Sequence, residues 1–268
     1  MNLQDQVAII TGSTRGIGYS LARQLAANGT GVIINSRKEA DVSKVVEEIN
    51  DLGGRAVGLA SPVNEPHTGE ELVHLAVERF GKVTILINNA GNTQDRMAYK
   101  MSDDEFQSVI SVHVNGTFYC TRAFIQQVIK QETGGQILNM TSTAGLTGTI
   151  GQLNYSAAKS AINGMTWTLA KELERHHIKV NAVAPAALTS MTEPHINRAR
   201  KKAAEQGMEL PTYWEVGSTD DVARFVTTLF TQPQFSKSGE IFGVNGDKLV
   251  RWQPSVPEEM ELADFINS

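Results

Sequence analysis

The sequence predicts an α/β protein with a single doubly wound parallel sheet and helices on both of its faces. Two observations predict this class. Seven short runs rich in Val and Ile recur along the chain, and segments with the apolar period of a helix separate them. Such runs, which do not alternate strictly with polar residues, are typical of strands covered on both faces. The strands are expected at residues 7–10, 31–35, 56–60, 84–88, 135–140, 179–185 and 240–246.

The domain organisation follows from the same pattern. The 268 residues contain no Pro/Gly/Ser-rich linker and no repeat other than the strand–helix alternation, so one domain is expected over residues 1–246. Residues 189–216 are polar and follow the sixth expected strand. Insertions after the carboxyl end of a strand commonly form lids, so a lid is expected there. Residues 247–268 are expected to form a C-terminal extension.

The composition argues against several classes of function. The net charge is −5, from 24 basic and 29 acidic residues, and no dense Lys/Arg block occurs, so nucleic-acid binding is not expected. The single cysteine, Cys120, has no disulfide partner in the chain and lies in an apolar run, so it is expected in the core. No apolar run has the length of a membrane span, and the N-terminus is unlike a secretory leader. We expect a cytoplasmic protein without membrane contact or a metal site.

A glycine-rich loop follows the first expected strand. Gly12, Gly16 and Gly18 precede a helical segment that stops near Gly29. The glycines allow a sharp turn and a close approach to a pyrophosphate, and the helix start offers unpaired N–H groups and the positive end of its dipole. The spacing G-x-x-x-G-x-G differs from the common fingerprint, but its place between strand and helix is that of a Rossmann-type dinucleotide site. The alternative is an ordinary tight turn.

The end of the second expected strand indicates which dinucleotide binds. An enzyme that selects NAD is expected to carry a carboxylate there for the ribose hydroxyls. This sequence has Ser36 followed by Arg37, and Arg15 lies in the glycine loop. A 2′-phosphate can accept hydrogen bonds from all three side chains. The cofactor hypothesis is therefore NADP(H), and the alternative is that both arginines are exposed surface charges.

The stretch NYSAAKS at residues 154–160 places Tyr155 four positions before Lys159. In a helix these two side chains share one face, so an ammonium can lie beside a phenol. Such pairs also occur on many amphipathic helices, where they only cover apolar surface. The spacing alone leaves both interpretations open, an acid–base pair or a surface helix.

Five motifs in order give the chain a family resemblance. After the glycine loop come NNAG at 88–91, NMTSTAG at 139–145, NYSAAK at 154–159 and NAVAP at 181–185. With these motifs the chain resembles the short-chain dehydrogenase/reductase family over about residues 5–190, and again in GSTDDVARFV and GEIFGVNG. The resemblance implies reversible hydride transfer between a nicotinamide cofactor and a carbonyl or secondary alcohol.

The resemblance also implies a catalytic group of Asn115, Ser142, Tyr155 and Lys159. Tyr155 would be the acid/base, and Ser142 would polarise the carbonyl on which negative charge grows as hydride arrives. A free phenol has a pKa of about 10, so the Lys159 ammonium and the positive nicotinamide would be needed to lower it. Lys159 would also hydrogen-bond the nicotinamide ribose. Asn115 would disturb its helix and hold a water linked to Lys159.

Alternatives remain at two of these positions. Thr141 and Thr143 flank Ser142 and carry the same hydroxyl, although the resemblance selects Ser142 by its thirteen-residue offset from Tyr155. Asn115 precedes a glycine and could equally be a turn residue.

The cofactor-binding residues implied by the resemblance lie in the glycine loop, at the ends of several strands and in the Tyr–Lys helix. The NAG stretch would pack beside the adenosine half, and the last three residues would orient the nicotinamide. The full set is Gly12, Ser13, Arg15, Gly16, Ile17, Gly18, Ser36, Arg37, Val63, Asn89, Ala90, Gly91, Tyr155, Lys159, Pro185, Leu188 and Ser190.

Three residues depart from the family pattern. Pro62 stands where the family usually has an Asp for the adenine amino group, and proline offers neither a side-chain acceptor nor an N–H. Thr84 replaces another Asp, and Ala186 replaces a Gly after Pro185. These changes bear on the adenine contact, on sheet stability and on the shape of the nicotinamide loop.

The closest resemblance is to 3-oxoacyl thioester reductases of the acyl-carrier-protein type, which implies a 3-oxoacyl thioester as substrate. In such enzymes an acidic carrier protein docks on a basic patch near the site. The candidate residues for that patch are Lys130, Arg175, His176, His177 and Lys179.

Two other functions remain open. One is a reductase or dehydrogenase of a free hydrophobic ketone or alcohol, steroid- or terpenoid-like, with pocket walls formed by Met191, Trp214, Trp252 and Pro254. The other is a non-catalytic cofactor-binding protein, because a fold does not imply a function. The resemblance further implies a homotetramer packed through helices around 104–130 and 155–176.

Overall fold

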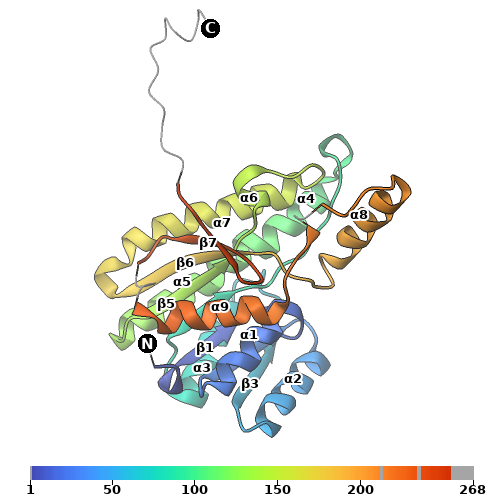
Figure 1. Ribbon diagram of the computed structural model, residues 1–268. Helices are drawn as coiled ribbons and strands as arrows, with labels where there is room; N and C mark the ends of the chain where they lie inside the picture. Colours follow the sequence, from blue (N-terminus) through green and yellow to red (C-terminus); the bar gives the residue numbers. More distant parts are fainter. Residues whose placement is uncertain (1, 212–213, 234–236, 255–268) are drawn as a thin grey trace, which may run out of the picture.

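The computed structural model describes residues 2–211, 214–233 and 237–254, and in this part of the chain eight strands form one sheet (Figure 1). Their order is β3-β2-β1-β4-β5-β6-β7-β8. The first seven strands are parallel, and β8 pairs with β7 in antiparallel orientation. The strands are β1 Val7–Ile10, β2 Gly31–Ser36, β3 Arg55–Ala60, β4 Ile85–Asn88, β5 Gly135–Met140, β6 Ile178–Pro185, β7 Ile241–Asn245 and β8 Lys248–Trp252.

All seven strands expected from the sequence are present, and all but the edge strand β3, where one residue of six is buried, are mostly buried. The side chains of β1 and β4 are buried throughout. β8 is not predicted by the sequence analysis, since four of its five residues are exposed and it carries no apolar run. The sheet therefore continues past residue 246 into an exposed antiparallel edge.

Helices cover both faces of the sheet, as the sequence predicts. α1 Gly16–Ala27, α2 Glu39–Asp51 and α9 Thr219–Thr231 pack on one face. α3 Thr68–Phe80, α5 Gly116–Gln131 and α7 Leu153–Glu172 pack on the other, where Cys120 lies in the core as expected. No helix in the described ranges is both long and apolar enough to span a membrane.

Further elements gather at the carboxyl ends of the parallel strands. α4 Asp103–Ile110, α6 Ala144–Thr147 and α8 Glu193–Glu205 follow β4, β5 and β6, and Figure 1 shows them at one end of the molecule. A π-helical turn, η3 Ser111–Asn115, joins α4 to α5. The 3₁₀ turns are η1 Leu3–Asp5, η2 Ala98–Lys100 and η4 Glu174–His176.

The strand order reverses at β1, which lies between β2 and β4. In open parallel sheets, ligands bind outside the carboxyl ends of the strands at such a switch point. The loops after β1 and β4 are the glycine loop and the NNAG stretch, so the topology brings the first two sequence motifs together.

Candidate active site

The glycine loop turns from β1 into α1 at this switch point. Gly12 and Gly16 have positive φ angles of 64° and 57°, a backbone conformation that favours glycine. α1 begins without a side-chain cap and without an acidic residue in its first turn. Its first N–H groups and the positive end of its dipole are therefore available to a phosphate, so the loop fits the pyrophosphate of a dinucleotide.

The NNAG stretch holds the glycine loop in place. The Asn89 side-chain amide donates to the carbonyls of Thr11 and Gly12 at 2.9 and 3.0 Å. A Cβ on Gly12 would lie 2.8 Å from the Ala90 Cα, and one on Gly18 would lie 2.5 Å from Asn89 Nδ2. Asn89 and Ala90 thus shape the loop from behind, a contact that the sequence analysis did not specify.

The residues expected at the adenosine ribose lie at the end of β2 and in the glycine loop. Ser36 is the last residue of β2 and is half-buried, whereas Arg37 and Arg15 are exposed. Neither arginine forms an ion pair within the described ranges, so both guanidinium groups can approach an anion. Pro62 uses its carbonyl to accept from the Thr68 hydroxyl at 2.8 Å, and the following Val63 is buried.

Ser142 is the hydroxyl that faces Tyr155 among the three candidates in the TST stretch. Thr141 is buried, and its hydroxyl donates to Asn163 Oδ1 at 2.6 Å, so it ties β5 to α7. Thr143 is exposed. The Ser142 side chain lies near enough to Tyr155 to lower the pKa of the phenol. The catalytic role of Ser142 stays a prediction.

Tyr155 and Lys159 share one face of α7, as their spacing predicts. The Lys159 Nζ lies 5.5 Å from the centre of the Tyr155 ring and donates to the Met140 carbonyl at 2.6 Å. Only 4% of Lys159 is exposed. The lysine is thus a buried group at the end of β5, and the surface-helix interpretation does not apply to it.

Burial dominates the titration of both groups. It raises the pKa of Tyr155 to about 12, while the hydrogen bond with Ser142 lowers this pKa and the Asp95 carboxylate raises it. Burial lowers the pKa of Lys159 to about 7. A neighbouring positive charge would favour the phenolate form of Tyr155.

Asn115 does not join this group. Its side chain is exposed, and within the described residues no hydrogen bond or ring contact connects it to Ser142, Tyr155 or Lys159. The prediction that it lies with them is wrong. The helix is disturbed where expected, by the π turn η3 that ends at Asn115, but the turn directs a different residue inwards.

That residue is His113, which the sequence analysis did not single out. It is 3% exposed, and its ring meets the Tyr155 ring edge-on with the centres 5.4 Å apart. His113 lies two positions before Asn115, the residue that the sequence predicts at the site. The feature of the sequence that indicates His113 is its titratable side chain so close to the predicted position.

The stretch after β6 approaches the glycine loop. Leu188 donates its N–H to the Gly217 carbonyl at 2.9 Å and leaves its side chain exposed, as does Ser190. The Thr189 methyl would lie 3.7 Å from a Cβ on Gly16, so this stretch borders the phosphate loop. Pro185 ends β6 beside it. Contact of this stretch with the nicotinamide half of a dinucleotide stays a prediction.

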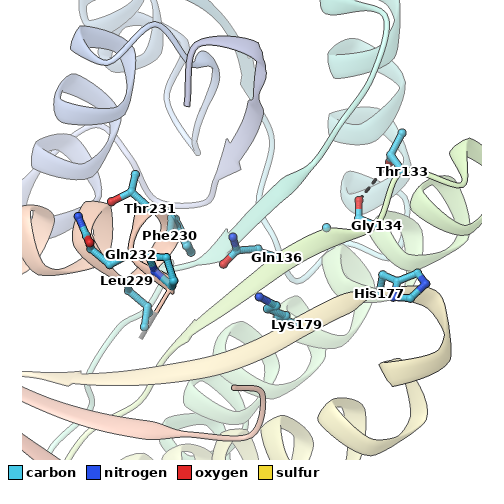
Figure 2. Close-up of a pocket in the computed structure, with 11 residues that line it drawn as sticks. Thr133, Gly134, Gln136, His177, Lys179, Leu229, Phe230, Thr231 and Gln232 are labelled. Carbon is cyan, nitrogen blue, oxygen red and sulfur yellow. Dashed lines mark hydrogen bonds between the residues drawn. The ribbon is translucent and has the colours of Figure 1, made fainter. Parts of the chain in front are cut away.

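The predicted basic patch lies at the other end of the sheet, which corrects the expectation that it is near the site. Lys179 is the second residue of β6 and His177 immediately precedes that strand, whereas Ser142 follows the end of β5. Figure 2 shows His177 and Lys179 lining a pocket with Gln136 and the end of α9. Lys130, Arg175 and His176 belong to the same end, because they lie at the C-termini of helices that run back from the carboxyl end.

Two of the proposed pocket walls for a hydrophobic ligand are also far from the site. Trp252 pairs with Ile241 at the amino end of β7, and Pro254 follows it. The antiparallel direction of β8 carries the chain back to that end. Met191 and Trp214 belong to the stretch near α8, and both are half-buried.

The site as built unites a dinucleotide loop with a hydroxyl, a phenol and a buried ammonium, which defines an oxidoreductase acting on CH–OH or C=O groups. Comparison with known proteins agrees. The family described as short chain dehydrogenase matches residues 6–201, and the chain belongs to this family. The family binds a nicotinamide cofactor.

Three relatives illustrate the range of similarity. A 3-oxoacyl-[acyl-carrier-protein] reductase of Synechocystis sp. is 37% identical over 91% of this chain and 97% of its own length. A hydroxyacyl-CoA dehydrogenase of Mycobacterium tuberculosis is 35% identical over 98% of this chain and 84% of its own length. A crystal structure of a short chain dehydrogenase from Mycobacterium avium superposes with a TM-score of 0.83 at 29% identity, covering 98% of this chain and 90% of that one.

Proposed function

We propose that the protein interconverts 3-oxoacyl and 3-hydroxyacyl thioesters with NADP(H), using Ser142, Tyr155 and Lys159. The observation that carries this proposal is that these three side chains lie together at the carboxyl end of β5, the same edge of the sheet at which the glycine loop follows β1 two strands away. The names of the curated relatives supply the thioester class.

Each of the three side chains has a role that follows from its position. The cofactor, when bound, supplies or accepts the hydride. Ser142 donates to the substrate oxygen, and Tyr155 delivers its proton to that oxygen during reduction or removes it during oxidation. Lys159 is fixed by the Met140 carbonyl and favours the phenolate of Tyr155 in its charged form.

NADP(H) is supported by the residues after β2. Ser36 replaces the carboxylate that would repel a 2′-phosphate, and Arg37 and Arg15 are exposed cations without ion-pair partners in the described part of the chain. Kinetics with both cofactors test this assignment. A preference for NADPH over NADH is expected, and it is expected to fall when Arg37 is replaced by Asp.

A second candidate concerns the carrier of the acyl group. The basic patch lies at the amino end of the sheet, far from the catalytic residues of the same chain. It therefore gives no established contact for a carrier protein that docks near those residues. This observation favours coenzyme A thioesters as substrates.

The free hydrophobic ketone is less well supported, because Trp252 and Pro254 lie at the wrong end of the sheet to line the site. The test is the rate of NADPH oxidation with acetoacetyl-CoA, with the same acyl group on a carrier protein, and with a panel of bulky free ketones. Turnover of the thioesters is expected. Turnover of free ketones alone would refute the proposal.

We also propose a homotetramer, with residues 189–216 acting as a lid. Three large apolar side chains are exposed on α5 and α7, namely Phe118, Ile129 and Leu153, and a second copy packing on these helices would cover them. α8 within the lid stretch is joined to the loop after β4 by His195 and Asp95, 3.5 Å apart. Light scattering after size-exclusion chromatography measures the assembly.

A further inference from the structure

The π turn η3 places one buried imidazole against the phenol of the site. η3 covers Ser111–Asn115, and π turns inside helices are frequent at functional sites because they redirect side chains. His113 at the middle of the turn is 3% exposed. Its ring meets that of Tyr155 at an interplanar angle of 85°, the edge-to-face arrangement that aromatic pairs favour.

The imidazole is held from its other side by the stretch after β4. Its Nε2 lies 2.9 Å from the Asn92 carbonyl oxygen and 3.2 Å from the Asn92 backbone nitrogen. A Cβ on Gly91 would lie 2.5 Å from His113 Cε1, so only glycine leaves room for the ring. His113 is therefore wedged between the backbone that supports the glycine loop and the ring of Tyr155.

The surroundings keep His113 uncharged. Burial, aided by the Lys159 ammonium and partly opposed by the bond with Asn92, lowers the pKa of His113 to about 3. Lys159 and Tyr155 face it from α7, and Asn92 faces it from the loop after β4. Asp95, farther along this loop, acts on Tyr155. A neutral ring adds no charge beside the phenol, so Lys159 remains the cation that acts on it.

We propose that His113 is a positioning residue for Tyr155: its wedged imidazole fixes the orientation of the phenol and covers one side of its ring. This inference rests on the role assigned to Tyr155 in the proposed function. The edge-on contact limits rotation of the Tyr155 ring, and the bond to the Asn92 backbone limits movement of the imidazole. His113 thus couples the position of the Tyr155 ring to that of the loop after β4, which in turn supports the glycine loop.

Two replacements separate the parts of this arrangement. His113→Asn retains a polar group for the Asn92 backbone but removes the ring and opens space beside the phenol. His113→Phe retains the ring contact but removes the bond to Asn92. His74→Asn, the same exchange at an exposed position on α3, is the matched control.

The readout is the ¹⁹F NMR signal of Tyr155 in full-length protein labelled with 3-fluorotyrosine. The chain has five tyrosines, and the resonance absent from Tyr155→Phe identifies the one of interest. Fluorine lowers the pKa of a phenol, which makes the titration accessible. Because water reaches the phenol in His113→Asn, its pKa is expected to fall toward the ordinary value, whereas His113→Phe and His74→Asn are expected to titrate as the parent does.

Kinetics complete the test. His113→Asn is expected to lower kcat on the order of tenfold with little change in the KM for either substrate, as expected for a misplaced acid/base. An unchanged Tyr155 titration in folded His113→Asn, or equal titrations in the Asn and Phe variants, would overturn the inference. The NMR readout needs no substrate, so it tests the contact between His113 and Tyr155 independently of the reaction. If the parent protein is inactive on thioesters but the variants titrate as expected, only the proposed function is refuted.

Discussion

The two ends of the sheet carry the same kinds of side chain in opposite surroundings. At the carboxyl end, Lys159 and His113 are buried, and burial lowers the pKa of both. At the amino end, His177 is exposed and Lys179 lines an open surface pocket (Figure 2). A cluster of basic residues in a sequence therefore does not indicate a binding or catalytic site by itself. The end of the strand at which a residue lies is the better indicator.

The largest expected effect comes from Tyr155→Phe, which removes the acid/base and leaves the ring. Turnover is expected to fall by roughly 10²- to 10⁴-fold, the usual contribution of general acid–base catalysis. NADPH binding, measured by its fluorescence, is expected to be unchanged. Retained turnover with cofactor still bound would show that Tyr155 is not the acid/base, and the carboxyl end would then no longer differ from the amino end in catalysis.

The next effect concerns the loop that the NNAG stretch supports. A Cβ on Gly18 would lie 2.5 Å from both the Gly12 carbonyl oxygen and Asn89 Nδ2, so Gly18→Ala forces the loop apart. We expect about 1–3 kcal/mol of lost stability, the usual cost of overpacking, and weaker NADPH binding.

Gly164→Ala on α7 is the matched control for that change, because a Cβ there meets no other atom within 4 Å. Alanine in a helix interior is favoured over glycine by about 0.5–1 kcal/mol, so this variant is expected to gain stability. Equal urea midpoints for the two variants would contradict the packing argument.

A third effect is a pH dependence of stability. The pKa of His113 is about 3 in the folded state against an ordinary value of 6.5, so the unfolded chain binds a proton that the folded chain does not as pH falls through this window. The free energy of unfolding therefore decreases toward low pH, by up to about 1.4 kcal/mol per pH unit.

His113→Phe is expected to flatten that slope, because it has no group to titrate. The same replacement at exposed His177 is expected to leave the slope as in the parent. Urea unfolding at several pH values between 4 and 7 measures both, and equal slopes in the two variants would show that His113 is not a buried neutral group.

The smallest expected effect is at the amino end. Lys179→Ala changes a group remote from the site, so kcat/KM for a coenzyme A thioester is expected to stay within about twofold, the scale of ordinary surface substitutions. A larger loss with a carrier-protein thioester alone would show that the amino-end patch docks the carrier, and it would reverse our preference for coenzyme A.

Much of the molecule could be predicted from the sequence, because its signals are local. Val/Ile runs specify buried strands, three glycines specify a phosphate loop, and the four-residue spacing places Tyr155 beside Lys159. Two errors have separate physical causes. The helical pattern cannot reveal a π turn, which rotates the following residues and exchanges His113 for Asn115 at the site. Strand direction decides to which end of the sheet a residue belongs, and a cluster of basic residues in the sequence does not reveal that direction.

The contact between α1 and α9 has a consequence for synthesis. Ser20 on α1 donates to the Thr219 hydroxyl on α9 at 2.8 Å, and both helices bury their apolar sides in the same cluster against the sheet. A ribosome releases α1 long before it has made α9. During translation of about two hundred residues, part of the apolar face of α1 therefore stays uncovered, and only the arrival of α9 closes that side of the core.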